Sequence, residues 1–351
     1  MTRNFRRPRG LVAAIGALVM TFGVGGGIAA AQGTGEIIVE GSSTVGPITS
    51  LVAELYGEEN PDVAITVGEL GTGDGFVQFC EGETDISDAS RPIKDEGEEG
   101  PACDANSIEY TELPVGVDGL TVIVNKKSNL GLKCLSQADL YALFGPESTG
   151  DLADASALAG ELGSTQTFKS SGTFKKFTPG PESGTYDAFI ELGYQDFLDE
   201  RVADGSVTDV IEEDGETLAA EPLISDGQFP NDNDIVKRVA ASESGVGFLG
   251  VAYFLANTDK LKAVAIEDPD SGNCVKPSIK TVQNGTYLPL SRTLYIYVNN
   301  AKAAENADVK DFVDFYLTKT NLTKTVKDAG YAPLSADDIQ ASIDAWASAS
   351  G

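Results

Sequence analysis

The sequence predicts an α/β fold with two lobes that close on a small ligand. Short β-branched runs alternate with helical periodicities along the chain, a pattern typical of strands covered by helices. Roughly 320 residues follow the N-terminal leader, more than one hydrophobic core usually organises. Three loops rich in Gly, Ser and Thr lie where predicted strands end or predicted helices begin, and α/β sheets place ligands at such edges. If one lobe holds two loops and the other holds the third, the cleft between them encloses the ligand.

Residues 1–31 are predicted to be a secretory signal peptide. Four arginines precede an apolar stretch from Leu11 to about Val24, and Ala29–Ala31 provides a cleavage site. The apolar stretch is short and contains glycines, so a permanent transmembrane helix is not expected. No cysteine follows the cleavage site to carry a lipid. We therefore expect a periplasmic or secreted protein without a direct membrane anchor.

The composition excludes several classes of protein. Residues 1–31 hold four of the 25 basic residues and none of the 54 acidic ones, so the remaining chain has 21 basic residues and a net charge of −33. Nucleic acids and anionic membranes bind basic surfaces, so neither is an expected partner. The chain has no histidine, which excludes Ser-His-Asp and Cys-His nucleophiles and imidazole general bases. Chemistry that uses carboxylates alone, as in glycosidases, stays open.

The four cysteines of an exported chain indicate disulfides rather than metal or thiol chemistry. They are Cys80, Cys103, Cys134 and Cys274. No CxxC spacing is present, so a zinc site is not expected, and we expect no cofactor. Three pairings are open at this point.

The first of the three loops is Gly41–Pro47. The β-branched run 36–40 before it predicts a buried strand, and Pro47 suits the first position of a helix whose apolar residues then repeat at helical spacing. The hydroxyls and backbone N–H groups of the loop can all face one point at the positive end of that helix, which is how a protein holds a small anion. The alternative is that Ser43 or Thr44 only caps the helix.

The second loop, residues 71–75, follows the predicted strand 63–68 and leads into a short helix. Its spacing is G-x-G-x-G, which is neither a Walker loop nor a Rossmann fingerprint, so alone it indicates a tight turn as readily as a site.

The run 85–92 predicts a short strand whose end presents Ser90 and Arg91. Residues 95–100 are predicted to be an acidic solvated loop.

Residues 115–125 are too apolar for anything but a central strand, and Gly116 and Gly119 suggest a crossing between lobes. Residues 146–165 are polar and predicted to be irregular. A later helix is predicted to be capped by Asp232 or Asp234.

The tripeptide Ser-Gly-Thr occurs at residues 171–173 and again at 183–185. The first copy is followed by Lys175, Lys176 and Pro179, which favour a strand or turn. The second is followed by a good helical sequence, so it is the third candidate loop for an anion, and the first copy is not a site.

These stretches together resemble the phosphate-binding proteins of bacterial ABC importers, the PstS type. The matching stretches follow the order of that family over nearly the whole chain, at residues 41–45, 71–76, 85–93, 118–125, 179–185, 232–233 and 290–298. The resemblance implies a periplasmic-binding-protein fold of type II, with two α/β lobes joined by two crossings and the ligand in the cleft. Lobe 1 is then expected to comprise residues 32–116 and 292–351, and lobe 2 residues 117–291.

The resemblance also implies a set of phosphate-binding residues. They are Ser43, Thr44, the Val45 amide, Thr72, Ser90, Arg91, Ser183, Gly184 and Thr185. The better-known branch of the family has an aspartate at the position of Ser90, which accepts the proton of phosphate, and an arginine at the position of Pro179; this chain has neither. Arg91 is expected to substitute as the cation, the alternative being an ordinary surface arginine. The acids that could accept a hydrogen bond from the phosphate proton are Asp88, Asp118 and Glu182.

The predicted lobes favour one disulfide pairing. Cys80 and Cys103 flank the acidic loop in lobe 1, and Cys134 and Cys274 both fall in lobe 2, so we expect these two pairs. The expected function is that of an extracytoplasmic substrate-binding protein, not an enzyme, which captures inorganic phosphate and delivers it to an ABC permease with its ATPase subunits. The alternatives are a secreted phosphatase or other acid-only hydrolase, and an anion-binding scaffold without a role in transport.

Overall fold

The computed structural model describes residues 35–95, 99–166, 171–181, 183–207, 210–211, 217–218 and 221–351. The predicted signal peptide and Glu182 lie outside the described residues. Residues 33–351 form one compact unit of mixed α/β structure. None of the described helices has the length and apolar composition that a membrane crossing requires.

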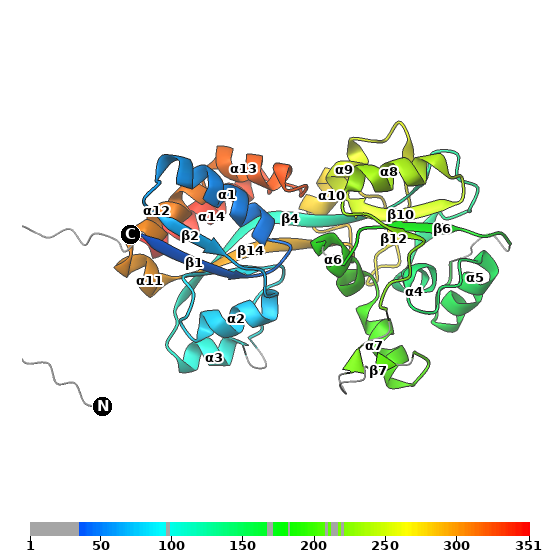
Figure 1. Cartoon of the computed structure of the whole chain (residues 1–351), viewed down its shortest axis with the longest axis horizontal. Helices are drawn as coiled ribbons and strands as arrows, with labels where there is room; N and C mark the ends of the chain where they lie inside the picture. The colour runs from blue at the N-terminus through cyan, green and yellow to red at the C-terminus, as the bar shows by residue number, and fades with distance from the viewer. Residues whose placement is uncertain are drawn as a thin grey trace, which may run out of the picture. The chain divides into compact units, whose positions relative to one another are not determined.

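A nine-stranded sheet runs through both lobes (Figure 1). Its order is β2-β1-β3-β14-β4-β10-β6-β9, and β11 also pairs with β4. The strands are β1 (Glu36–Gly41), β2 (Ala64–Val67), β3 (Ile86–Ala89), β4 (Tyr110–Asn125), β6 (Lys175–Thr178), β9 (Gly227–Gln228), β10 (Gly245–Gly250), β11 (Leu261–Ala263) and β14 (Ser291–Asn299).

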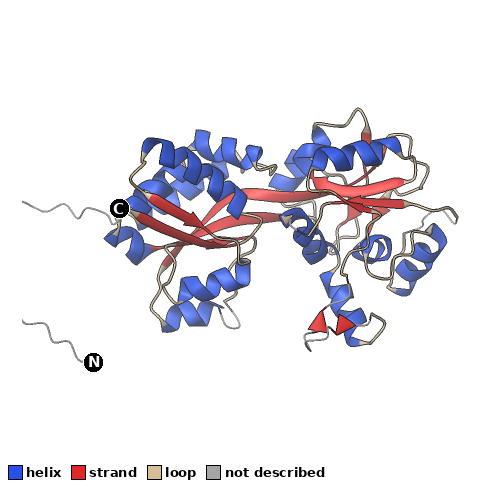
Figure 2. Cartoon of the chain, in the orientation of Figure 1, coloured by secondary structure: helices blue, strands red, loops and turns tan. Residues whose placement is uncertain are grey.

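The long strand β4 connects the two lobes together with β14. Up to Gly119 it pairs antiparallel with β14, and from Leu120 it pairs antiparallel with β10. Figure 2 shows both strands running from one group of helices to the other. The predicted lobe boundaries at residues 116/117 and 291/292 fall within β4 and at the start of β14.

Lobe 1 has parallel strands β2, β1 and β3 with helices around them. Its helices are α1 (Gly46–Glu59), α2 (Thr72–Cys80), α3 (Glu99–Ala105), α11 (Asn300–Glu305), α12 (Ala307–Tyr316), α13 (Lys319–Asp328) and α14 (Ala336–Ala349). The predicted acidic loop 95–100 therefore ends in the first turn of α3, while residues 96–98 lie outside the described part.

Lobe 2 is built on the second half of β4 with β10, β6, β9 and β11. Its helices are α4 (Gln137–Phe144), α5 (Leu152–Glu161), α6 (Gly184–Gly193), α7 (Gln195–Ala203), α8 (Asp232–Ala241), α9 (Val251–Leu255) and α10 (Ile279–Gln283). Two small sheets complete it, one of β5 (Cys134–Leu135), β12 (Ala265–Glu267) and β13 (Cys274–Val275), the other of β7 (Val210–Ile211) and β8 (Thr217–Leu218).

Two local predictions are wrong. Residues 146–165 are not irregular throughout: they contain helix α5, which Asp151 caps by accepting from Ala153 N at 2.8 Å and from the next amide. Leu152, Ala155 and Ala159 of that helix are buried at helical spacing. Helix α8 is capped by Asn231, whose side chain accepts from the Asn233 N–H, and not by either aspartate.

The structure contains both expected disulfides. Cys80 and Cys103 join α2 to α3 in lobe 1, and Cys134 and Cys274 join β5 to β13 in lobe 2. Neither disulfide links the two lobes, so neither restrains their relative motion directly.

Candidate functional site

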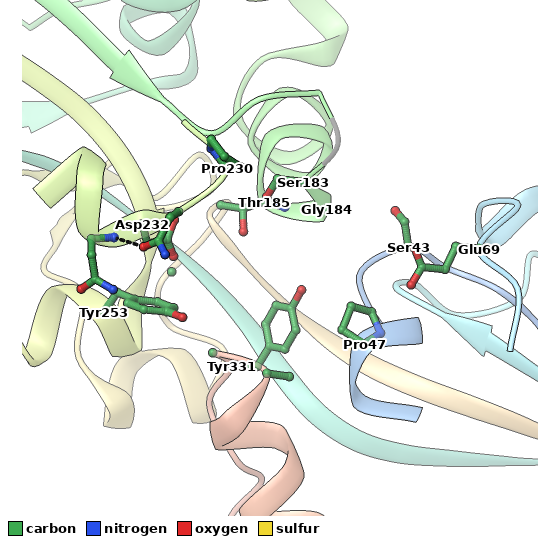
Figure 3. Close-up of a pocket in the computed structure, with 15 residues that line it drawn as sticks. Ser43, Pro47, Glu69, Ser183, Gly184, Thr185, Pro230, Asp232, Tyr253 and Tyr331 are labelled. Atoms are coloured by element: carbon green, nitrogen blue, oxygen red, sulfur yellow. Dashed lines mark hydrogen bonds between the residues drawn. The ribbon is translucent and has the colours of Figure 1, made fainter. Parts of the chain in front are cut away.

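A cavity of about 350 Å³ lies between the lobes and is lined by the starts of three helices (Figure 3). Ser43 and Pro47 come from the start of α1 in lobe 1. Residues 183–185 come from the start of α6, and residues 231–233 from the start of α8, both in lobe 2. Helix N-termini carry unpaired N–H groups and a partial positive charge, so their convergence favours an anion.

The loop before α1 is held in shape by Ser42. The Ser42 Oγ accepts from Thr44 N at 3.1 Å, and the Ser42 carbonyl accepts from the amides of Val45 and Gly46 at 3.1 and 2.8 Å. Val45 occupies the N-cap position, where no side chain makes a capping bond. The alternative that Ser43 or Thr44 only caps the helix is therefore not what the structure contains.

The loop before α6 touches the loop before α1. Ser183 caps α6 by accepting from Thr185 N at 3.3 Å. A Cβ on Gly184 would lie 3.2 Å from both Ser43 O and Thr44 Oγ1, so only glycine fits this contact without a shift of its neighbours. The structure thus brings together the predicted site residues of the first and third loops, one from each lobe.

The other Ser-Gly-Thr copy has no part in this arrangement. Residues 171–173 are exposed and precede β6, and Thr173 forms an isolated β-bridge with Asp151. None of the three residues lines the cavity.

The second loop lies beside the first but outside the cavity wall. A Cβ on Gly75 would lie 2.5 Å from Gly41 Cα, so the start of α2 packs directly on the end of β1. Thr72 Oγ1 lies 3.0 Å from Ser90 Oγ and accepts from Ser90 N at 3.2 Å. These two predicted site residues therefore contact each other and do not line the cavity.

Arg91, the predicted cation, is paired within lobe 1. Its guanidinium donates to both carboxylate oxygens of Glu99, at 2.9 and 2.6 Å, and lies over the Phe76 ring. The side chain does not line the cavity.

The cation next to the loops is instead Arg292, which sequence reasoning missed; it contacts the first loop from outside the cavity wall. Its Nη2 donates to Thr44 Oγ1 at 3.3 Å, and its Nε lies 3.7 Å from Asp118 Oδ2. The side chain is only 9% exposed. The signal that could have revealed it is a lone charge at the start of an otherwise apolar strand, since buried charges are almost always paired or functional.

Two of the three acids predicted to accept the phosphate proton, Asp88 and Asp118, are buried outside the cavity wall. Asp88 accepts from Thr49 Oγ1 at 2.9 Å, and burial raises its pKa to about 8. Burial also raises the pKa of Asp118 to about 6, although Arg292 and the Gly119 N–H act in the opposite direction. The third predicted acid, Glu182, lies outside the described residues.

Two other acids line the cavity, Glu69 from lobe 1 and Asp232 from lobe 2 (Figure 3). The Glu69 carboxylate lies over Gly46 at the start of α1, where an added Cβ would be 2.7 Å from its Oε1. Burial raises the pKa of both carboxyls, that of Asp232 to about 6. Sequence reasoning missed Glu69 because nothing in the linear pattern separates it from the many surface acids.

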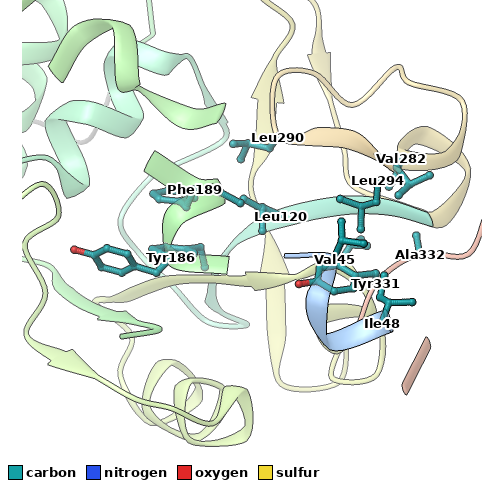
Figure 4. Close-up of a cluster of buried hydrophobic side chains, with 14 of the residues drawn as sticks. Val45, Ile48, Leu120, Tyr186, Phe189, Val282, Leu290, Leu294, Tyr331 and Ala332 are labelled. Carbon is teal, nitrogen blue, oxygen red and sulfur yellow. The ribbon is translucent and has the colours of Figure 1, made fainter. Parts of the chain in front are cut away.

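Apolar side chains from both lobes pack around the loops (Figure 4). Val45 at the N-cap of α1 and Ile48 within α1 belong to the same buried cluster as Leu120 of β4, Phe189 of α6 and Leu294 of β14. Because this cluster includes both crossing strands, the polar loops are supported by a core that continues from one lobe to the other.

The buried Asp88 carboxyl is expected to make the stability of the folded protein depend on pH. Folding raises its pKa from the ordinary 3.8 to about 8, first through burial and then through Glu69 and Glu40, while the Thr49 hydroxyl opposes the shift. Between these values the unfolded chain binds fewer protons than the folded one, so this group's contribution to stability is present at low pH and is lost as pH rises to about 8.

Asp88→Asn should remove that loss. A pKa difference of one corresponds to about 1.4 kcal/mol. At pH 8 the free energy of unfolding of the variant should therefore exceed that of the wild type by on the order of several kcal/mol, and urea denaturation should show a higher midpoint. At pH 4.5 the two proteins should differ little. If the free energy of unfolding depended on pH in the same way in the variant and the wild type, the raised pKa assigned to Asp88 would be wrong.

Comparisons with known proteins cover both lobes. A family model described as a PBP superfamily domain matches residues 28–320. The chain is 37% identical to protein SphX of Synechococcus elongatus over 86% of this chain and 78% of that protein. It is 34% identical to the phosphate-binding protein PstS of Staphylococcus saprophyticus over 93% of this chain and 89% of that protein. The crystal structure of a possible phosphate binding protein from Planctomyces limnophilus matches with a TM-score of 0.71 at 31% identity, over 90% of this chain and 98% of that one.

Proposed function

The chain belongs to the PBP superfamily and, within it, to the family of PstS-type phosphate-binding proteins, and on this premise we propose that it captures inorganic phosphate between its lobes and delivers it to an ABC importer. The observation that supports this most strongly is the contact between the α1 and α6 loops, because it places hydroxyls and helix N-termini of both lobes around one point. Closure of the cleft on an anion then completes the site.

The contacts proposed for phosphate come from both lobes. Lobe 1 supplies Ser43, Thr44 and the Val45 amide, and lobe 2 supplies Ser183–Thr185. Micromolar binding needs about 8 kcal/mol, and hydrogen bonds to a charged group contribute about 1.5–3 kcal/mol each. A few such bonds are therefore sufficient. Thr72 and Ser90, which lie next to the first loop, are proposed as additional phosphate-binding residues of lobe 1.

Transport implies a location and partners. PstS-type receptors act outside the cytoplasm, and we propose that residues 1–31 direct export and that the partner is a permease with its ATPase subunits. Receptors of this family bind substrate without converting it, so a chromogenic phosphate ester should be left intact.

The direct test is calorimetric titration of the purified protein with phosphate, sulfate and molybdate. Phosphate is expected to bind with a micromolar or lower Kd, and the other two anions much more weakly. A protein that gives no heat and no thermal stabilisation with phosphate would overturn the proposed function.

Selectivity against sulfate provides a more specific prediction. Phosphate carries at least one proton at neutral pH and sulfate carries none, so a carboxylate in the site accepts a hydrogen bond from phosphate but repels sulfate. The resemblance to the family pointed to Asp88, Asp118 and Glu182 for this role. In the structure, however, the acid of lobe 1 that lines the cavity together with Ser43 is Glu69.

Glu69→Gln is therefore expected to narrow the gap between the phosphate and sulfate affinities by about tenfold, equivalent to about 1.4 kcal/mol. Asp88→Asn serves as the control, because the Asp88 carboxyl already accepts from Thr49 outside the cavity wall. Asp118→Asn and Glu182→Gln complete the set of titrations. If all four variants reject sulfate as the wild type does, selectivity comes from the hydroxyls and amides instead.

A further inference from the structure

Arg292 connects the two lobes at the crossing strands. It lies near the start of β14, opposite Asp118 of β4 in the antiparallel register. Its Nη2 donates to Thr44 Oγ1 of lobe 1 at 3.3 Å, and its Nη1 donates to Glu191 Oε2 of lobe 2 at 2.5 Å. One guanidinium therefore contacts an anion loop of the first lobe and helix α6 of the second.

The guanidinium is enclosed but not fully hydrogen-bonded. The Arg292 Nε and the facing Asp118 Oδ2 are both buried, and neither has a hydrogen-bond partner within the described ranges. Burial raises the pKa of Asp187, a third acid, and the arginine is close enough to oppose that shift. The Nε–H faces Asp118 at 3.7 Å, so a further acceptor reaches this guanidinium through its Nη groups, which bind Thr44 and Glu191.

These Nη groups lie next to the loops of both lobes. Thr44 Oγ1 accepts from Arg292 and also lies 3.2 Å from the position that a Gly184 Cβ would take. An anion held by the Thr44 hydroxyl and the first N–H groups of α6 is therefore beside the guanidinium.

The two paired carboxylates of Arg292 differ in how easily they can leave. Asp118 is 1% exposed and fixed within β4, whereas the Glu191 side chain is 48% exposed on the surface of α6. Guanidinium binds carboxylate and phosphate with the same planar fork. Because water already solvates half of the Glu191 side chain, this carboxylate can leave the guanidinium at a lower desolvation cost than buried Asp118, so a phosphate can replace Glu191 while Asp118 stays in place.

We propose that Arg292 binds the captured phosphate and that Glu191 is an internal competitor, whose carboxylate occupies the guanidinium until phosphate displaces it. The inference rests on the proposed function and extends it by naming the cation of the site and the group that limits its affinity. Because phosphate must release the Glu191 contact to bind, removal of this carboxylate raises the affinity.

Titration of the whole protein with inorganic phosphate tests the proposal. Glu191→Gln is expected to bind phosphate about two- to fivefold more tightly. Arg292→Ala is expected to bind about 10- to 100-fold more weakly. Glu191→Gln in the Arg292→Ala background should change the affinity by less than about twofold, since the competitor acts only through the arginine.

Glu161→Gln is the matched control. Glu161 is an exposed acid of lobe 2 that pairs with Arg201 at 2.9 Å, so this variant removes the same charge without touching Arg292. It should bind phosphate as the wild type does. Arg292→Lys keeps the charge but loses the fork, so a folded Arg292→Lys protein with weakened binding separates a ligand role from a purely structural one.

Three results would overturn the inference alone: wild-type affinity in Glu191→Gln, an equal gain in Glu161→Gln, or wild-type affinity in Arg292→Ala. A wild-type protein that binds no phosphate would instead remove the proposed function on which the inference rests.

Discussion

A variant that carries both Ser183→Ala and Thr185→Val is expected to lose phosphate binding. These substitutions remove two hydroxyls at the start of α6, one of which also orders the loop by accepting from Thr185 N. Two hydrogen bonds to a charged ligand contribute about 3–6 kcal/mol together, so the Kd should rise by at least about 100-fold. Calorimetric titration with phosphate measures the change, and circular dichroism checks that the protein remains folded.

The chain supplies its own control for this experiment. Ser171→Ala with Thr173→Val makes the same chemical change in the other Ser-Gly-Thr copy, which is exposed and does not line the cavity. This double variant should bind phosphate nearly as the wild type does. Equal affinities in the two double variants would show that the assignment of the site to the second copy is wrong.

Removal of the disulfide in lobe 2 is expected to have the second large effect. Cys134 and Cys274 are 140 residues apart, so their bond closes a long loop in the unfolded chain. In the chain-entropy model a loop of this length corresponds to about 5 kcal/mol of stability. The variant with both cysteines changed to serine should therefore unfold at a much lower urea concentration than the oxidised wild type.

The disulfide in lobe 1 is the comparison. Cys80 and Cys103 are 23 residues apart, which corresponds to about 3 kcal/mol in the same model. The serine variant of this pair should lose less stability than the variant in lobe 2. If the two losses were equal, or their order reversed, loop closure would not be the dominant contribution of these bonds.

The local alternation of strand, loop and helix was accessible from the sequence. The run before Gly41 forms β1, and the glycine loop 71–75 forms the start of α2. The distinction between the two Ser-Gly-Thr copies also agrees with the elements that follow them, β6 and α6. These features depend on the few residues next to each position, so periodicity, proline and glycine indicate them.

Helix α5 shows where local reading failed. Its polar surroundings suggested irregular structure, but a single capping aspartate and three buried apolar residues are enough to form the helix against its neighbours. Tertiary packing outweighs composition in such segments, because the apolar face of a short helix is stabilised only by the surface it covers.

The sequence by itself determined the type of fold, the position of the glycine-, serine- and threonine-rich loops and, through the missing histidine, which kinds of chemistry the chain cannot use. Only the tertiary structure decided which charges accompany those loops. Arg91 is paired with Glu99, eight residues away, whereas Arg292 reaches Thr44 across 248 residues and Glu191 across 101. A charged side chain interacts with whatever the folded chain places within a few ångströms of it, and those distances are set by the two crossing strands and the core around them, not by neighbours in the sequence.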